Sequence, residues 1–213
     1  MFSYISFDVV LNHFNERVST HNKLCELLEA NNTEEFVSIA VGFDDLYRNG
    51  NYSASEHSLG EKILASNDNV YNRIFAFAQE IYESEKRVNI PKKINGLGLS
   101  YLKISIGSEI ATMLKPDIYW VANIRTLWTQ AYLRNNFSIN NANATISEIQ
   151  KQLSEQDIRR DYNLWAGLYP TLEDSLREVS RIGNGIVGNL APSNNIFLWA
   201  DAICSELFEK RSK

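Results

Sequence analysis

Apolar residues recur at intervals of three and four along most of the 213-residue chain, which places them on one face of an α-helix. No segment alternates apolar and polar residues as a half-buried β-strand would. Only four Pro and ten Gly interrupt the pattern, and this scarcity favours long helices over a many-turned β fold. The first apolar stripe consists of Phe7, Val10, Leu11, Phe14 and Val18. The spacing therefore predicts an all-α fold of about ten helices.

A chain of this length, with 44% hydrophobic residues, is large enough to bury a core of its own. We expect one compact multi-helix domain over residues 1–213, or the same chain in two lobes, residues 1–90 and 91–213. The Asn-rich segment 135–143 is predicted to be a loop. Helix starts are then indicated where a Ser or Thr precedes an acid by three residues, at Thr145–Glu148, Ser154–Asp157 and Thr171–Asp174.

The composition argues against several functional classes. Cys25 and Cys204 lie far apart, so neither a disulfide nor a zinc or iron–sulfur site is expected. His13, His21 and His57 stand on separate segments, and the sequence contains no recognisable Cys–His pairing or other nucleophilic motif. We therefore expect no metal and no cofactor.

The N-terminus lacks the basic residues of a signal peptide and reaches Asp8 early. No apolar run attains the roughly 18 residues that a membrane-spanning helix needs. These features predict a cytoplasmic protein without a membrane partner. The net charge of −5 also disfavours a surface coated in positive charge.

Positive charge is nevertheless concentrated in one segment of this acidic chain. Residues 86–103 contain five Lys or Arg and no Asp or Glu. Such a group of cations can attract a nucleic-acid backbone and release its counterions. It also fits a solvated helix end and linker, because Lys and Arg complement a helix C-terminus. The five residues are Lys86, Arg87, Lys92, Lys93 and Lys103.

Two glycines lie within this segment, in the sequence I-N-G-L-G-L-S at residues 94–100, between two predicted helices. Because no strand precedes the glycines, a dinucleotide-binding fold is excluded. A helix–Gly-X-Gly–helix turn can point free backbone N–H groups at an anion, and glycine lets a phosphate approach without a Cβ in the way. A tight interhelical turn with glycine at a C-cap is the alternative. The expected phosphate-binding residues are Lys92, Lys93, Gly96, Gly98 and Ser100.

Residues 92–134 combine a basic segment, the sequence I-N-G-L-G-L-S-Y-L-K, an apolar helix and then L-K-P-D-I-Y-W-V-A-N-I-R. This order resembles the helix-hairpin-helix DNA glycosylase superfamily. In that family an h-x-G-h-G hairpin grips the DNA backbone, and the next helix leads to a short loop that carries a catalytic Asp. The resemblance implies an all-α DNA-binding protein with a helix-hairpin-helix element.

The same resemblance implies where a reaction would take place. Asn123 stands where the catalytic Asp of the family is expected, and an amide cannot act as a base or stabilise an oxocarbenium ion as a carboxylate can. Asp117 is the substitute carboxylate, with an acid at a helix N-terminus as its structural alternative. Lys103 lies near the position at which some members carry a catalytic Lys. The residues therefore fit an inactive or repurposed relative at least as well as an active glycosylase.

The segment after the predicted hairpin contains two charged residues that are costly to bury and several large aromatic residues. Glu109 and Arg125 lie amid apolar residues, where an unpaired charge is expensive. An ion pair between them on adjacent helices is the expected solution, and the alternative is that both line a pocket. Aromatic residues at helical spacing could form core or could stack on a base extruded from DNA. These are Tyr119, Trp120, Trp128 and Tyr132.

A function from another class fits the sequence nearly as well. The chain could be a protein-interaction module or inhibitor, for example in a conflict between phage and host. The negative charge, the absence of recognisable catalytic residues and two aromatic residues expected at the surface, Phe137 and Tyr169, favour this alternative. The sequence thus leaves two hypotheses, DNA binding and binding of a protein partner.

Overall fold

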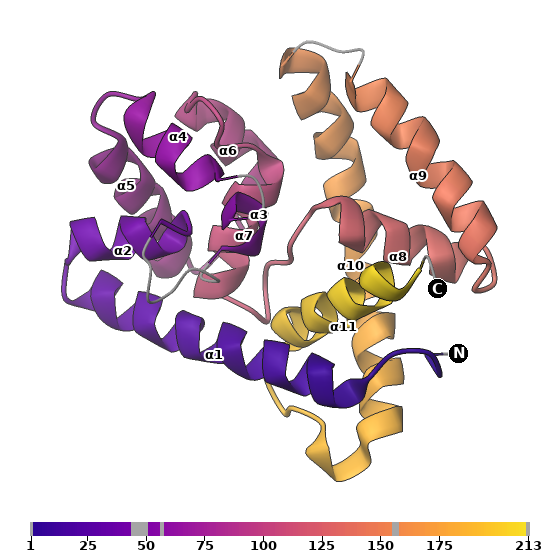
Figure 1. Cartoon of the computed structure of the whole chain (residues 1–213). Coiled ribbons are helices and arrows are strands. Elements are labelled where there is room, and N and C mark those ends of the chain that lie inside the picture. Colours follow the sequence, from indigo (N-terminus) through magenta and orange to yellow (C-terminus); the bar gives the residue numbers. More distant parts are fainter. Residues whose placement is uncertain (1, 44–50, 56–57, 155–157, 212–213) are drawn as a thin grey trace. The chain divides into compact units, whose positions relative to one another are not determined.

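The chain is α-helical in the computed structural model, which describes residues 2–43, 51–55, 58–154 and 158–211 (Figure 1). No β-strand occurs within these residues, so the predicted all-α fold is confirmed. The helices are α1 (Phe7–Glu29), α2 (Thr33–Ala40), α3 (Tyr52–Ser55), α4 (Leu59–Ala65), α5 (Val70–Glu83), α6 (Ile90–Leu97), α7 (Ile104–Leu114), α8 (Ile124–Arg134), α9 (Ile139–Ser154), α10 (Ile158–Val187), the short 3₁₀-helix η1 (Gly188–Leu190) and α11 (Ile196–Lys210).

The chain divides into two compact units. The first unit comprises Met1–Phe14 and Ala122–Lys213, and the second unit comprises Asn15–Val121. Helix α1 contributes residues to both. A lobe boundary after residue 90 would fall inside the second unit, at the start of α6. It would separate α5 from α6, which contact each other in that unit.

In the second unit, α7 lies at the centre of the packing. All of its residues except Ser105 are buried, and α3, α5 and α6 contact it. Gly107 allows α6 to approach closely, because a Cβ at this position would lie 2.5 Å from the side chain of Ile94. Helix α5 packs its wide apolar stripe against α7 and α2; its buried residues are Val70, Ile74, Phe75, Phe77, Ala78 and Ile81.

In the first unit, α8, α10 and α11 contact one another, and α9 packs on α8. Gly183 of α10 permits close packing on α11, since a Cβ there would lie 2.4 Å from Cδ1 of Ile203. Trp199 of α11 is fully buried, with ring centroids 6.2 Å from Phe7 and 5.5 Å from Phe14. The core of this unit therefore includes side chains from the N-terminal part of α1 as well as from the C-terminal helix α11.

The predicted loop 135–143 is shorter than expected, since only residues 135–138 are non-helical, and the predicted helix start at Thr145 is wrong. Helix α9 begins at Ile139, and Thr145 lies in its interior. There the Thr145 hydroxyl donates to the carbonyl oxygen of Asn141, four residues earlier, at 2.9 Å. A Thr within a helix bonds the preceding turn in this way when the residues before it are also helical.

The predicted helix start at Thr171 is also wrong. Helix α10 runs continuously through this position although Pro170 stands inside it. Proline at a helix interior removes one backbone hydrogen bond, but tertiary packing can outweigh that loss. The Thr171 hydroxyl donates to the Leu168 carbonyl at 2.9 Å instead of capping a new helix. The third predicted start, Ser154–Asp157, extends outside the described residues.

Candidate functional site

Helix α6 presents one polar face to solvent and one apolar face to the second unit. Its N-terminus is capped by Asn89, whose side chain accepts a hydrogen bond from the Lys92 amide at 3.0 Å. Ile90, Pro91 and Ile94 are buried. The exposed face is made of Lys92, Asn95 and Gly96, which lie three and four residues apart and therefore share one side of the helix.

Gly98 ends α6 and does not open the next helix. It adopts the left-handed conformation, with φ of 59°, and its N–H donates to the Asn95 carbonyl at 3.2 Å. This is the C-cap role that favours glycine. Gly96 lies inside α6, and α7 begins only at Ile104. The turn is therefore longer than the expected helix–Gly-X-Gly–helix turn, and the Gly98 amide is not free to bind an anion.

The two glycines do leave an open surface. A Cβ built at Gly96 would meet nothing within 4 Å, and at Gly98 the nearest atom would be Nη2 of Arg73 at 3.9 Å. Both glycines are exposed. A ligand could therefore approach the backbone here without displacing a side chain.

The loop from Leu99 to Lys103 is held in place by hydrogen bonds and buried leucines. The Ser100 N–H donates to Oδ1 of Asn67 at 2.7 Å, and Nδ2 of Asn67 donates to the Ser100 carbonyl at 3.1 Å. Leu99 and Leu102 are buried. Because Asn67 already occupies the Ser100 amide, the serine can offer only its hydroxyl to a phosphate.

The expected lysines differ in their partners. Lys92 and Lys103 are exposed, and the Lys103 side chain makes no capping bond although this residue is the N-cap of α7. Lys93 forms an ion pair with Glu80 of α5. Arg87 lies with its guanidinium 5.0 Å from the ring centroid of Trp120 and donates to the Ile118 carbonyl at 3.2 Å.

Within the segment itself no surface acid offsets this positive charge, and the Glu80 that pairs with Lys93 lies on α5. The one acid between residues 86 and 116 is Glu109, which is 1% exposed. The solvent-facing charge of the described segment 86–116 is therefore entirely positive.

The predicted ion pair between Glu109 and Arg125 is wrong. Glu109 pairs with Arg17 of α1, and both side chains are almost fully buried, at 1% and 0% exposure. Arg125 belongs to the first unit, where its Nη2 lies 3.8 Å from Oε1 of Glu209. The partner of Glu109 is 92 residues away in sequence, so helical spacing gives no indication of the pair.

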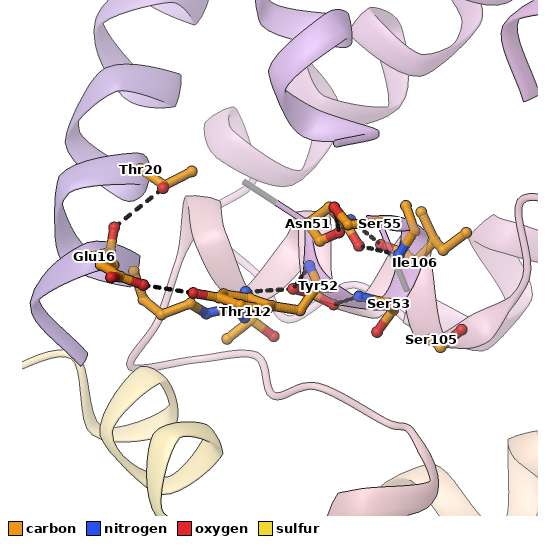
Figure 2. Close-up of polar contacts among 12 residues, drawn as sticks. Glu16, Thr20, Asn51, Tyr52, Ser53, Ser55, Ser105, Ile106 and Thr112 are labelled. Atoms are coloured by element: carbon orange, nitrogen blue, oxygen red, sulfur yellow. Dashed lines mark hydrogen bonds and ion pairs between the residues drawn. The ribbon is translucent and has the colours of Figure 1, made fainter. Parts of the chain in front are cut away.

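The Glu109 carboxylate also binds the start of α3. It accepts hydrogen bonds from the backbone N–H groups of Tyr52, at 2.8 Å, and Ser53, at 3.1 Å. Figure 2 shows Tyr52 extending toward Glu16, and the Tyr52 hydroxyl donates to Oε2 of Glu16 at 2.7 Å. The Arg17 guanidinium lies 5.2 Å from the Tyr52 ring centroid. A charged side chain can be buried when it is paired in this way.

Asn51 completes the polar cluster. Its Nδ2 donates to the carbonyl oxygens of Ala40, at 2.9 Å, and Ile106, at 3.3 Å, while its Oδ1 accepts from the Ala54 N–H at 3.1 Å (Figure 2). Burial, and next the hydrogen bond to Glu16, raise the pKa of the Tyr52 hydroxyl, which keeps it protonated. The cluster thus ties α3 to α1, α2 and α7 and provides no free base.

Two of the three candidate catalytic residues, Asn123 and Asp117, lie in different units. Asn123 is the N-cap of α8 in the first unit, and its Oδ1 accepts from the backbone N–H groups of Arg125, at 3.0 Å, and Thr126, at 3.1 Å. The Thr126 hydroxyl returns the contact by accepting from the Asn123 N–H at 3.0 Å. Asp117 is exposed in a turn of the second unit and does not start a helix. Asn123 therefore has a structural task that explains its residue type.

The aromatic residues expected to stack on a base are buried. Tyr119 and Trp120 are covered in the second unit, where the Tyr119 hydroxyl accepts from the Val88 N–H at 2.8 Å. In the first unit Trp128 stacks on Tyr132, with centroids 5.1 Å apart, and its Nε1 donates to Asn143 at 2.7 Å. Their ring faces are occupied by protein. Of the two aromatic residues expected at the surface, Tyr169 is buried and Phe137 is half-buried.

Tyr101 is the aromatic residue of this region that sequence reasoning overlooked. It follows the glycines in the I-N-G-L-G-L-S-Y-L-K sequence and is exposed. The exposure of Tyr101 could not be predicted because its neighbours Leu99 and Leu102 are apolar and indicate a buried segment. A loop also lacks the periodicity that shows which residues of a helix face solvent.

A Cys–His contact does exist, contrary to the sequence expectation. Sγ of Cys25 lies 3.6 Å from Nδ1 of His21 on α1. Burial, followed by the charges of Glu29 and Glu26, raises the pKa of the Cys25 thiol to about 11. Nδ1 of His21 also bonds the Met113 carbonyl, which can only accept, so this nitrogen carries the proton and cannot take one from the thiol.

His13 lies in the first unit and is half-buried, and His57 lies outside the described residues. Across the described ranges, no three His, Cys, Asp or Glu side chains gather in a way that could hold a metal ion. None of the described helices combines the length and the apolar character needed to cross a membrane.

Comparison with known proteins gives no relative, because no family model, no curated protein and no solved structure matches the chain. The resemblance of residues 92–134 to helix-hairpin-helix DNA glycosylases therefore stays a prediction. The functional argument depends on the α6–α7 region itself.

Proposed function

We propose that the chain binds the sugar–phosphate backbone of DNA through α6 and the loop that joins it to α7. The observation that carries this proposal is the charge of the segment 86–116, whose surface side chains include cations and no carboxylate in a chain of net charge −5. Lys92 and Lys103 are the principal phosphate contacts, because both are exposed. Lys93 contributes less, since a phosphate must compete with Glu80 for it.

The open surface at Gly96 and Gly98 supports the same proposal. A phosphodiester group is bulky, and it must come close to the backbone of this region if Lys92 and Lys103 are both to reach it. No atom lies within 4 Å of a Cβ built at Gly96, and at Gly98 the nearest is Nη2 of Arg73 at 3.9 Å. Contacts of this kind position a protein on DNA without reading its sequence.

The proposal concerns binding and not base excision. Asn123 carries an amide where a glycosylase would need a carboxylate, and its oxygen already accepts two backbone hydrogen bonds. Asp117 lies in the other unit, in an exposed turn. We therefore expect the protein to bind DNA without releasing a base.

A filter-binding measurement with duplex DNA at two salt concentrations tests the proposal. If about three phosphates are contacted, the logarithm of the binding constant falls with the logarithm of salt concentration with a slope of about −2.7. Lys92→Ala/Lys93→Ala/Lys103→Ala should weaken binding uniformly across sequences and flatten that slope. Lys62→Ala, on the exposed face of α4 in the same unit, is the matched control and should leave the slope unchanged. Absence of binding at low salt, to duplex and to single-stranded DNA alike, would refute the proposal.

One observation favours a protein partner as the second candidate function. The apolar side chains of Ile186, at the end of α10, and Leu190, in η1, are exposed, Leu190 to 68%. Apolar groups of this size at the surface are common in protein-binding surfaces when they lie together. Stable co-purification with one protein, lost in Ile186→Ser/Leu190→Ser, together with no DNA binding, would favour this function over the first.

A further inference from the structure

An exposed tyrosine stands in the loop between α6 and α7. Tyr101 is 45% exposed, and among the exposed large apolar side chains of the described residues it and Phe43 are the aromatic ones. A ring that remains in water gains little hydrophobic stabilisation from folding. No hydrogen bond to the Tyr101 hydroxyl is present within the described part of the chain. The stability of the fold therefore does not explain the position of this ring.

The backbone at Tyr101 is held in an unfavourable conformation. Its φ of 65° lies in the left-handed region, where the Cβ of a bulky residue crowds the following carbonyl oxygen. The neighbours keep it there, since Leu99 and Leu102 are buried on either side and Asn67 fixes both backbone groups of Ser100. The loop thus presents the ring from a fixed backbone instead of letting it fold back onto the protein.

Cations and an open backbone precede and follow Tyr101 along the chain. Lys103 is two residues beyond Tyr101, and Lys92 lies on the exposed face of α6. The rise of a helix places Lys92 about 9 Å along the axis from Gly98, which is within the span of a few nucleotides. Between them, Gly96 and Gly98 carry no side chain that would block a strand.

We propose that this loop binds an unpaired stretch of DNA, with Tyr101 stacked on an unpaired base and Lys92 and Lys103 on the flanking phosphates. This inference rests on the proposed DNA binding and names the form of DNA that the site takes. Bases within a duplex already stack on their neighbours and offer no free face to a side chain. Aromatic stacking combined with cationic contacts to the backbone is how proteins hold single strands without regard to sequence.

The test compares two labelled probes by fluorescence anisotropy at the same low salt, using the full chain. One probe is an oligothymidylate of about 20 nucleotides, which accommodates the site size of a single-strand-binding module, and the other is a duplex of equal length. We expect tighter binding of the single strand. An oligouridylate of the same length distinguishes DNA from RNA, and tighter binding of that probe would overturn the assignment to DNA.

Tyr101→Gly is the decisive variant. It removes the ring and also relieves the backbone, because glycine adopts a positive φ freely, so the fold is not put at risk. Its affinity for the single strand should fall by about 10-fold or more, with duplex binding unchanged. Tyr101→Phe keeps a ring and should bind as the parent protein does. Phe43→Ala removes the other exposed aromatic residue of the second unit and should have no effect.

The failure of this inference can be distinguished from failure of the proposed function. Equal affinity for the two DNA probes, or single-strand binding by Tyr101→Gly at the parent level, would overturn the stacking role while leaving backbone binding intact. Equal weakening of both probes by Tyr101→Gly would also overturn the assignment to unpaired DNA. No binding to either probe would refute DNA binding itself, and this inference with it.

Discussion

Two sets of charged residues in the second unit differ completely in their surroundings. Arg17 and Glu109 are buried, and the carboxylate is surrounded by protein donors. Lys92 and Lys103 are exposed, and within the described residues no acid pairs with either of them. The first set stabilises the arrangement of helices, and the second remains available to a ligand.

This difference shows that burial, and not charge alone, determines whether a charged residue stabilises the fold or remains available to a ligand. A buried charge loses its hydration and must regain that free energy from its partners, so it is bound to a fixed geometry. An exposed lysine keeps its hydration and moves freely, and it can exchange water for a phosphate at little cost. Variants that change one set should therefore leave the property governed by the other set unaffected.

The largest effect is expected from Glu109→Gln. Arg17 would keep its positive charge in a buried site after its carboxylate partner is removed, which typically costs about 3 to 5 kcal/mol. Chemical denaturation followed by circular dichroism would measure the loss in the free energy of unfolding. At temperatures where the variant is still folded, its DNA affinity should match that of the parent protein.

A double variant provides the control for this prediction. Arg17→Met/Glu109→Leu removes both charges together and fills the site with apolar side chains, so it should be more stable than Glu109→Gln. If Glu109→Gln unfolded at the same denaturant concentration as the parent protein, the buried pair would not be holding α1 and α7 together.

An intermediate effect is expected from Asn67→Ala, which acts on the loop without changing any charge. The side chain makes hydrogen bonds to both backbone groups of Ser100 and to the Ile63 carbonyl. Their loss should cost about 1 to 2 kcal/mol, because each contributes roughly 1 kcal/mol and the site is partly exposed. Hydrogen exchange of the Ser100 amide should become faster while exchange in α7 is unchanged.

Asn95→Ala is the matched control for that variant. This asparagine is exposed on α6 near the same loop, and its replacement should leave the exchange rate of Ser100 as it is in the parent protein. Slow exchange of Ser100 in Asn67→Ala would mean that the buried leucines alone fix the loop.

The general fold could be predicted from the sequence because helical periodicity is a local property. Helix α7 is one example, since its dense apolar residues are buried as expected. The boundaries of α9 and α10 could not be predicted in the same way. Thr145 and Thr171 have neighbours at capping-box spacing, but whether a helix begins at such a residue depends on packing of the residues before it.

The candidate site was less predictable because it depends on contacts distant in sequence. Nothing in the spacing of α7 indicates that Glu109 meets Arg17, and nothing in the spacing of α6 indicates that Lys93 meets Glu80. One signal was present and was overlooked: Asn123 is followed three residues later by Thr126, a polar pair at capping-box spacing. The basic segment, in contrast, was visible in sequence because a local excess of charge needs no knowledge of contacts.

The smallest effect on stability is expected from Lys92→Ala/Lys103→Ala, and this variant defines the comparison most sharply. Surface substitutions that remove no capping bond and no ion pair usually change the free energy of unfolding by less than about 0.5 kcal/mol. Neither lysine makes a described ion pair, and Lys103, although it is the N-cap residue of α7, makes no side-chain capping bond. The same double variant should nevertheless reduce the steepness of the salt dependence of DNA binding by about 1.8 in the logarithmic slope, because two phosphate contacts are lost. Denaturation and anisotropy titrations on one preparation would measure both quantities. A loss of stability as large as that expected for Glu109→Gln would show that these lysines are structural, and the distinction between the two sets of charges would then fail.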